Sequence, residues 1–374
     1  MSRFSNLGHR LYQGEISFDF VGRRKLWYSI SAVIVLVAGI GLALGLKLGI
    51  EFEGGSVYTV TKPGLTVSQA QTAADSILHD TKALVQSTDK GAVKIQISAE
   101  EQIPAETFIS ELSKDLAVPA NEINAQVIGP SWGEEISKKA LLGLVIFMVL
   151  VTIYLAIAFE WRMAIAALVA LIHDLLITIG VYALVGFEVT PGTVIGFLTI
   201  LGYSLYDTVV VFDTVKENAK GITRQNKVTF SEAANAGLNQ TLVRSINTTV
   251  VALLPVAALL FIGGGFLGAG TLNDISLALF IGLAAGAYSS ICVATPLYAQ
   301  LKEATPEMRA LAKKVAARRA ADAKAAEERA AAGLPEEDPQ APQDEADDES
   351  AGMVGQRNQP VSKSRTRGRP SGKH

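Results

Sequence analysis

The sequence predicts a polytopic α-helical membrane protein with six transmembrane helices and one small α+β domain outside the membrane. Apolar residues make up 49% of the 374-residue chain although its last fifth is highly polar, so they must be concentrated in blocks. Six of these blocks reach roughly 20 residues, the length that spans the hydrocarbon core of a bilayer. The connection between the first two blocks is much longer than the others and alternates between strand-like and helix-like patterns.

The first block could be mistaken for a secretory signal peptide, because Arg23, Arg24 and Lys25 precede it. It is too long for the apolar region of a signal peptide, starts too far into the chain and lacks an Ala-x-Ala cleavage site, so we interpret it as an uncleaved span. The six predicted spans are residues 26–48, 140–159, 162–185, 192–213, 245–267 and 274–298.

The distribution of Lys and Arg among the connections predicts the orientation of the spans. The N-terminal segment 1–25 is basic, Arg162 lies between the second and third spans, and the connection between the fourth and fifth holds Lys216, Lys220, Arg224 and Lys227. The connections 186–191 and 264–273 contain no Lys or Arg. Since basic residues are retained on the cytoplasmic side, both termini are predicted to be cytoplasmic in a multi-pass protein of a cytoplasmic membrane.

The segment 49–138 is then extracytoplasmic and predicts a ferredoxin-like domain with the order β-α-β-β-α-β. The expected elements are a strand over Ser56–Thr61, a helix over Val67–Leu78, strands over Ala83–Gln86 and Val93–Ile97, a helix opened by Pro104 and a strand over Ile123–Ile128. This domain contains no cysteine and no clustered acid–base pair. We therefore expect a binding or moving part rather than an active site.

The chain changes character in the predicted cytoplasmic tail, residues 299–374. Lys302–Arg329 is rich in Ala, Lys, Arg and Glu and predicts a solvated helix. Beyond about residue 333 the composition is too polar to bury a core, which predicts disorder. The basic C-terminal end either contacts anionic lipid headgroups or ribosomal RNA, or is a solvated run of charges without a fixed partner.

Asp207 is the most informative single residue, because it interrupts the fourth apolar block. A carboxylate at that depth costs roughly 2.5–3.5 kcal/mol on insertion scales and usually faces a partner or a water path. Tyr203 and Ser204 share its helix face, and Arg244, at the predicted start of the fifth span, is the expected cationic partner. Burial and a nearby cation shift a carboxyl pKa in opposite directions, which suits a group that takes up and releases a proton. The alternative is a static ion pair between helices.

Further polar residues lie in or near the spans. Asp174, beside His173 in the third span, is either a second proton site or a hydrogen-bond acceptor that orients the fourth span. Asp213 is expected to reach water near the cytoplasmic border. Three residues about one turn beyond Arg244 either line the same cavity or bond neighbouring helices: Asn247, Thr248 and Thr249. Gly196 and Gly202 are expected to let neighbouring helices approach the fourth span closely.

No familiar enzyme chemistry is visible in the sequence. Residues 263–268 match GxGxxG by spelling but do not follow a strand, so they do not predict a phosphate site. No P-loop, HExxH motif or Ser/His/Asp arrangement is present. Cys292 is the only cysteine, which excludes an internal disulfide and a cysteine metal cluster and predicts a buried apolar side chain. We expect neither enzymatic activity nor a cofactor or metal.

Several motifs together closely resemble the SecF subunits of the bacterial Sec protein-export machinery, within the SecD/SecF family of the resistance-nodulation-division (RND) superfamily. The resemblance covers roughly residues 15–300. Its motifs are the basic segment Phe20–Lys25, the element Phe52-x-Gly54-Gly55, and the segments Leu171–Asp174, Gly202–Asp213, Glu217–Asn218 and Gln240–Thr249. Two positions depart from the family pattern: Tyr206 stands where Asn is common, and Thr214 where a basic residue is common. The tail beyond residue 300 lies outside the resemblance.

The resemblance implies a six-helix RND-type half that works with SecD and uses the proton motive force to promote polypeptide translocation. It implies that Asp207 and Arg244 take part in proton conduction. The expected partners are SecD, the SecYEG channel, accessory Sec subunits, the translocating preprotein and membrane lipids, with no specific nucleic acid. The alternatives are a proton-driven RND exporter of lipids or small hydrophobic molecules, and an assembly scaffold that transports nothing.

Overall fold

In the residues that the computed structural model describes, six segments are helical, long and apolar enough to cross a membrane, as the sequence predicts. The structure describes residues 17–78, 83–87, 92–98, 103–264 and 270–331. The first five spans are the helices α2 (Arg24–Leu44), α6 (Pro130–Ala158), α7 (Trp161–Val185), α8 (Pro191–Asn218) and α9 (Phe230–Ala258). The sixth is a continuous run of three helical segments, α10 (Gly270–Ser289), the π-helix η4 (Ser290–Ala294) and α11 (Thr295–Glu303).

Two helices begin well before the apolar blocks that predict them. α6 starts with Pro130 at its first position, where the missing N–H of proline costs nothing. α9 starts at Phe230 behind a capping box formed by Thr229 and Glu232. Hydropathy marks only the apolar part of a helix, and the first turns of both helices consist largely of polar sequence. The last residues of the predicted 49–138 domain therefore belong to α6.

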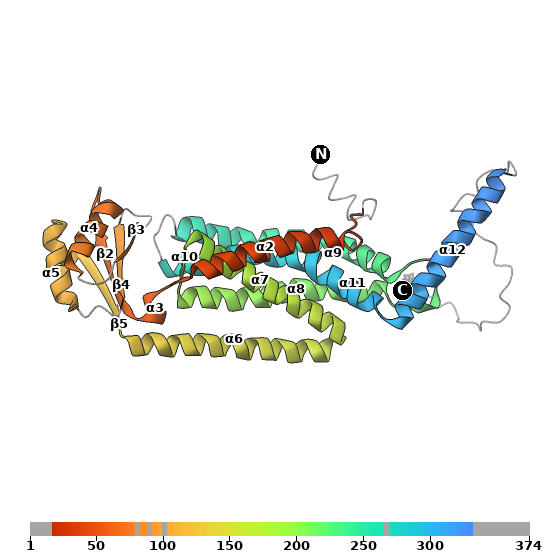
Figure 1. Cartoon of the computed structure of the whole chain (residues 1–374), viewed down its shortest axis with the longest axis horizontal. Coiled ribbons are helices and arrows are strands. Elements are labelled where there is room, and N and C mark those ends of the chain that lie inside the picture. Colours follow the sequence, from red (N-terminus) through yellow and green to blue (C-terminus); the bar gives the residue numbers. More distant parts are fainter. Residues whose placement is uncertain (1–16, 79–82, 88–91, 99–102, 265–269, 332–374) are drawn as a thin grey trace, which may run out of the picture. The chain divides into compact units, whose positions relative to one another are not determined.

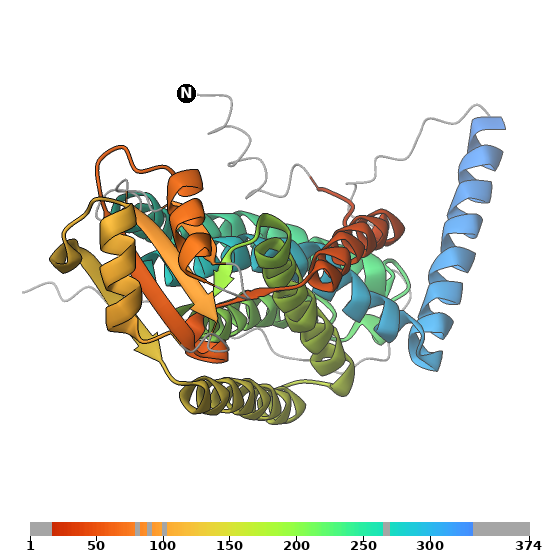
Figure 2. The same ribbon diagram turned by 60° about the vertical axis from the view of Figure 1, so that its left-hand side comes forward.

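The segment between α2 and α6 folds into a domain built on a four-stranded antiparallel sheet, hereafter the sheet domain (residues 55–128). Its elements follow the predicted β-α-β-β-α-β order, and the strand order in the sheet is β3-β4-β2-β5. α4 and α5 cover one face of the sheet (Figures 1 and 2). The elements are β2 (Gly55–Thr61), α4 (Val67–Ile77), β3 (Leu84–Ser87), β4 (Ala92–Ser98), α5 (Ala105–Asp115), the 3₁₀ turn η1 (Ala120–Glu122) and β5 (Ile123–Ile128).

The core of the sheet domain lies between the sheet and its two helices. Tyr58 of β2 and Phe108 of α5 are almost completely buried there, with ring centroids 4.5 Å apart. Burial raises the pKa of the Tyr58 phenol, which is neutral at neutral pH even at its ordinary pKa of about 10. Successive side chains of a strand point to opposite faces of the sheet, so Tyr58 and Val60 of β2 both point toward the helices.

We expect Phe108→Ala to destabilise the sheet domain by about 3–5 kcal/mol, because the substitution removes a buried aromatic ring and leaves a cavity. Protease sensitivity of the sheet domain in the full-length protein should rise accordingly. Val127→Ala is the matched control, since Val127 lies on the edge strand β5 and is 61% exposed. Equal protease sensitivity of the two variants would contradict this assignment of the core.

A small parallel ladder that the sequence does not predict joins the end of α2 to the α7–α8 connection. Its strands are β1 (Lys47–Leu48) and β6 (Glu188–Val189). Lys94 of β4 forms an ion pair with Glu188 at 2.6 Å, and the Gln96 amide donates to the Leu48 carbonyl at 3.4 Å. The polar face of the sheet therefore contacts the connection between α7 and α8.

Close helix contacts in the bundle depend on small residues, although not all of those predicted. At Gly196 of α8 a Cβ would lie 2.7 Å from the Ala278 Cβ of α10, so the predicted close approach is confirmed there. Gly202, by contrast, has nothing within 4 Å of its Cβ direction among the described residues. The prediction for Gly202 is wrong, since this glycine lies on an exposed face of α8.

Beyond the bundle, α12 (Pro306–Ala331) confirms the helix predicted for the start of the tail. It is not wholly solvated, because Met308, Leu311 and Val315 are buried. The predicted disorder beyond about residue 333 lies outside the described residues. Three further short elements complete the described chain: α3 (Ile50–Glu53), the 3₁₀ turn η2 (Ile222–Arg224) and the π-helix η3 (Leu259–Gly264).

Candidate functional site

Two carboxylates among the described residues lie buried inside the helical bundle. Asp174 of α7 is completely buried and Asp207 of α8 is 5% exposed. Burying an ionised carboxylate is costly unless hydrogen bonds or an opposite charge compensate it. The groups that surround these two side chains therefore define the candidate site.

Asp207 is held by hydroxyl groups from two other helical segments. The Ser245 hydroxyl of α9 lies 2.8 Å from each carboxylate oxygen of Asp207. The Ser290 hydroxyl, at the start of η4, donates to Oδ2 of the same carboxylate. α8, α9 and the last span thus meet at this one side chain.

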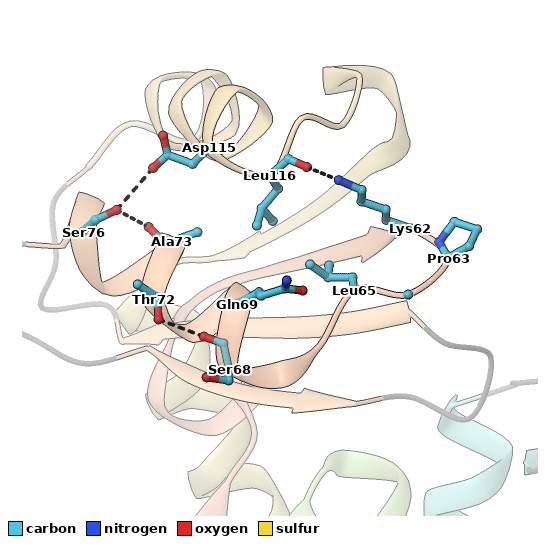
Figure 3. A pocket seen from close by; sticks show the side chains of 11 residues that line it. Lys62, Pro63, Leu65, Ser68, Gln69, Thr72, Ala73, Ser76, Asp115 and Leu116 are labelled. Carbon is cyan, nitrogen blue, oxygen red and sulfur yellow. Dashed lines mark hydrogen bonds between the residues drawn. The ribbon is translucent and has the colours of Figure 1, made fainter.

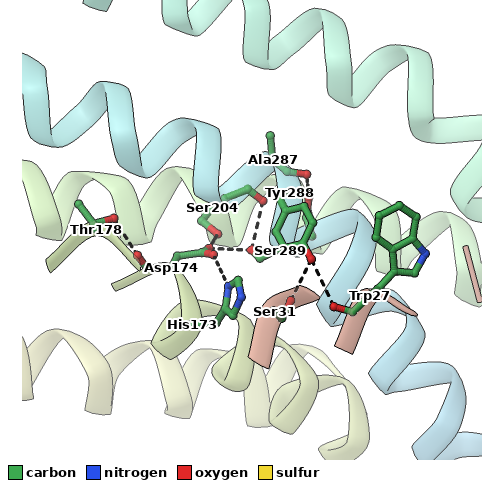
Figure 4. Close-up of polar contacts among 11 residues, drawn as sticks. Trp27, Ser31, His173, Asp174, Thr178, Ser204, Ala287, Tyr288 and Ser289 are labelled. Atoms are coloured by element: carbon green, nitrogen blue, oxygen red, sulfur yellow. Dashed lines mark hydrogen bonds and ion pairs between the residues drawn. The ribbon is translucent and has the colours of Figure 1, made fainter. Parts of the chain in front are cut away.

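Asp174 has a similar hydroxyl environment, shown in Figure 4. Its Oδ2 accepts hydrogen bonds from Ser204 of α8 at 2.5 Å and from Ser289 of α10 at 2.8 Å. Nδ1 of His173 lies 3.3 Å from the other oxygen, Oδ1. Ser204 precedes Asp207 by three residues on α8, about 4.5 Å along the helix axis, so the serine that bonds Asp174 lies nearer the sheet domain than Asp207 does.

His173 connects this site to α2. Its ring stacks on Tyr288 with centroids 6.0 Å apart, and the Tyr288 hydroxyl lies 3.0 Å from the Ser31 hydroxyl of α2 (Figure 4). The buried Nε2 of His173 has no hydrogen-bond partner among the described residues. The imidazole therefore has capacity for one further polar neighbour.

The expected ion pair between Asp207 and Arg244 does not form within the described part of the chain. Arg244 is exposed on α9, and the adjacent Ser245, not Arg244, turns toward Asp207. The sequence predicts a helix start at Arg244, where the positive end of the helix dipole would favour a carboxylate partner. α9 begins 14 residues earlier, at Phe230, so no such dipole effect acts on Arg244.

The other predicted polar residues are spread around this centre. Tyr203 is partly buried, while Asp213 and Asn247 are exposed. The exposure of Asp213 agrees with the expectation that this side chain reaches water. The Thr248 hydroxyl donates within its own helix, to the Arg244 and Ser245 carbonyls at 3.0 Å each. The buried Thr249 hydroxyl has no partner among the described residues.

Three of the four serines that bond the two carboxylates are not predicted from the sequence: Ser245, Ser289 and Ser290. Serine is common in membrane helices and often bonds its own backbone, so its presence alone does not predict a site. The only signal was position: Ser245 follows Arg244 directly, and the other two are consecutive in an apolar block.

The predicted structural motif Phe52-x-Gly54-Gly55 forms the junction between α3 and β2. Phe52 is buried against an apolar cluster that includes Tyr182 and Val189. Gly54 and Gly55 take φ angles of 78° and 135°, a region that favours glycine. The motif therefore turns the chain from the bundle into the sheet domain.

The sheet domain contains an open groove of about 610 Å³ between α4, α5 and the end of β2 (Figure 3). Its walls are mixed, with the apolar Leu65 and Leu116 beside the polar side chains of Ser68, Gln69 and Thr72. The Lys62 ammonium donates to the Leu116 carbonyl at one end. No group of three or more His, Cys, Asp or Glu side chains that could hold a metal ion occurs in the described residues.

Comparison with known proteins identifies the bundle. Residues 109–304, just over half of the chain, match the family described as "Protein export membrane protein SecD/SecF, C-terminal". The chain belongs to the SecD/SecF family. Within it, "Protein translocase subunit SecF" of Streptomyces coelicolor is 59% identical over the full length of both chains. The protein of that name from Mycobacterium tuberculosis is 42% identical over 78% of this chain and 70% of its own.

A solved structure from the SecD/SecF family has the same fold. The crystal structure of SecDF, described as a translocon-associated membrane protein, from Thermus thermophilus superposes with a TM-score of 0.66 at 30% identity. The match covers 77% of this chain and 39% of the Thermus chain. This chain therefore corresponds to about two-fifths of that SecDF polypeptide.

Proposed function

We propose that this chain is an accessory subunit of a Sec protein translocase that works with SecD and uses the proton motive force to promote polypeptide translocation. The observation that carries the proposal is the pair of buried carboxylates, Asp174 and Asp207, inside the bundle of a SecD/SecF family protein. Intramembrane carboxylates usually mark ion or proton pathways. The similarity to SecF proteins, and to a SecDF structure that joins both parts in one chain, supports SecD as the partner.

Asp174, Asp207 and Arg244 are the proposed proton-conducting residues. The Lys and Arg distribution supports cytoplasmic termini and a sheet domain outside the cytoplasmic membrane. A proton moving inward then meets Asp174 before Asp207. Arg244 lies at the depth of Asp207 but faces away from it. We therefore propose that a negatively charged group of SecD pairs with Arg244.

The proton cycle would move the sheet domain through the α7–α8 connection. α7 carries Asp174 and α8 carries Asp207, and β6 between them pairs with β1 and, through Glu188, with Lys94 of the sheet. One charge moved through about 100 mV supplies about 2.3 kcal/mol, enough to change a two-state equilibrium by more than tenfold. The groove between α4 and α5, with its mixed walls, suits an extended polypeptide such as an emerging preprotein.

A small-molecule exporter fits the structure less well. The described part of the bundle contains an apolar cavity of about 230 Å³, lined by residues that include Phe52, Leu141 and Phe197. Sites for drug-sized ligands commonly have about 300–1,000 Å³. The sheet domain is also small for a docking domain.

Translocation in inverted membrane vesicles tests the proposed function. Vesicles with SecYEG, SecD and this chain should complete export of a secreted preprotein faster when a proton gradient is present, and vesicles without this chain should lose that gain. Accumulation of a small hydrophobic dye by the same vesicles should not depend on this chain. Gradient-dependent dye transport without an effect on the preprotein would support the exporter instead.

A further inference from the structure

Two consecutive serines contact both buried carboxylates. Ser289 is the last residue of α10 and Ser290 the first of η4, and both are completely buried. Ser289 donates to Asp174 at 2.8 Å, while Ser290 donates to Asp207. One dipeptide in the last span therefore joins acids that belong to two different helices, α7 and α8.

Each of these hydroxyls has a second acceptor in its own helix. Ser289 Oγ lies 3.2 Å from the Gly286 carbonyl, and Ser290 Oγ lies 3.3 Å from the Ala287 carbonyl. A hydroxyl has one proton to donate, whereas an ionised carboxylate only accepts and a protonated carboxyl also donates. When the acid gains a proton, the serine can accept from it and turn its own proton to the helix carbonyl.

The backbone at this point is suited to respond. η4 is π-helical over Ser290–Ala294, and π-helical turns inside α-helices are frequent at functional sites. The Thr295 hydroxyl donates to the Ser290 carbonyl at 2.9 Å, five residues away. Serine hydroxyls that bond carbonyls one turn back bend helices, so a change of acceptor at two neighbouring serines alters the local helix geometry.

We propose that Ser289 and Ser290 are positioning residues that convert the protonation of Asp174 and Asp207 into a rearrangement of η4. This inference deepens the proposed function and rests on it for the role of the two acids. The other titratable groups close to the acids are His173, whose Nδ1 lies 3.3 Å from Asp174, and Tyr288, which stacks on His173. On the Asp207 side, Tyr203 interacts electrostatically with the carboxylate.

Cys292 provides a native probe of this rearrangement, because it is the only cysteine of the chain and lies buried within η4. The experiment measures the alkylation rate of Cys292 by N-ethylmaleimide in the complex with SecD in lipid vesicles, quantified on its peptide at one fixed pH. Asp207→Asn is neutral and carries a donor, and so imitates the protonated acid. It should change the rate about fivefold, the factor that corresponds to about 1 kcal/mol, the usual contribution of one hydrogen bond.

A double-mutant cycle assigns the effect to the serine. In a Ser290→Ala background, Asp207→Asn should no longer change the alkylation rate. In Ser290→Thr, which keeps the hydroxyl, the change should persist. Ser276→Ala is the matched control: Ser276 is a buried serine of α10 whose hydroxyl bonds the Asn273 carbonyl. The effect of Asp207→Asn should be undiminished in that background.

An effect of Asp207→Asn that persists in Ser290→Ala, or that disappears equally in Ser276→Ala, overturns the proposal. If Ser290→Ala does not assemble, Ser289→Ala combined with Asp174→Asn provides an independent arm with the same two outcomes. The alkylation rate does not depend on export. A serine-independent rate therefore refutes only this inference, whereas undiminished export by Asp207→Asn refutes only the proposed function.

Discussion

Replacing Asp207 with Asn is expected to abolish the gradient-dependent part of preprotein export while assembly with SecD survives. The amide keeps the shape of the side chain and can still bond Ser245 and Ser290, but it cannot bind and release a proton. Because one proton driven through about 100 mV supplies about 2.3 kcal/mol, we expect the gradient-dependent rate to fall by about tenfold or more. The measurement is translocation into inverted vesicles with and without a proton gradient.

Asp213→Asn is the matched control for this prediction. It changes the same side chain on the same helix, but Asp213 is exposed and does not reach the buried centre. Export by this variant should remain dependent on the gradient. Co-purification with SecD should be unchanged for both variants. Undiminished gradient-driven export by Asp207→Asn would remove the proton mechanism and leave the scaffold as the better interpretation.

Gly180→Ala is expected to destabilise the bundle. A Cβ at Gly180 of α7 would lie 2.2 Å from the Ala38 Cβ and 2.6 Å from the Ala38 Cα of α2. The second of these atoms is backbone, so α2 has to shift as a whole. Overpacking of this kind costs about 1–3 kcal/mol. Thermal unfolding of the detergent-solubilised protein should therefore occur at a clearly lower temperature.

Gly202→Ala is the same chemical change, but we do not expect it to lower the unfolding temperature. Gly202 is exposed on α8, and its Cβ direction is open among the described residues. Alanine in a helix interior is favoured over glycine by about 0.5–1 kcal/mol, so this variant should unfold at the same or a higher temperature. A lower unfolding temperature for Gly202→Ala than for Gly180→Ala would contradict the helix packing described for this protein.

The sequence allowed the spans to be counted but not their ends to be placed. The difference is clearest for α9, where the polar stretch from Phe230 to Arg244 lowers the hydropathy although it is helical. The capping box of Thr229 and Glu232 was present as a signal for the true start. Without it, Arg244 was assigned to a helix end and given an electrostatic role that a residue in the helix interior does not have.

The residues of the candidate site also divide into those that the sequence predicts and those that depend on how the helices pack. Asp174 and Asp207 could be identified from the sequence, because a carboxylate in an apolar block is costly wherever the helix packs. Which groups compensate that cost depends on helix rotation, and one residue along a helix turns a side chain by about 100°. Ser245 therefore faces Asp207 while Arg244 faces outward, and no pattern of spacing distinguishes the two.

Six membrane-spanning helices, a small α+β domain and two acids inside apolar spans could be predicted from local composition and periodicity. The packing of the helices was needed to show that serines rather than an arginine contact the acids, and that the last span contacts both. Local sequence determines how polar a segment is, whereas the direction of each side chain is settled only when the helices pack together.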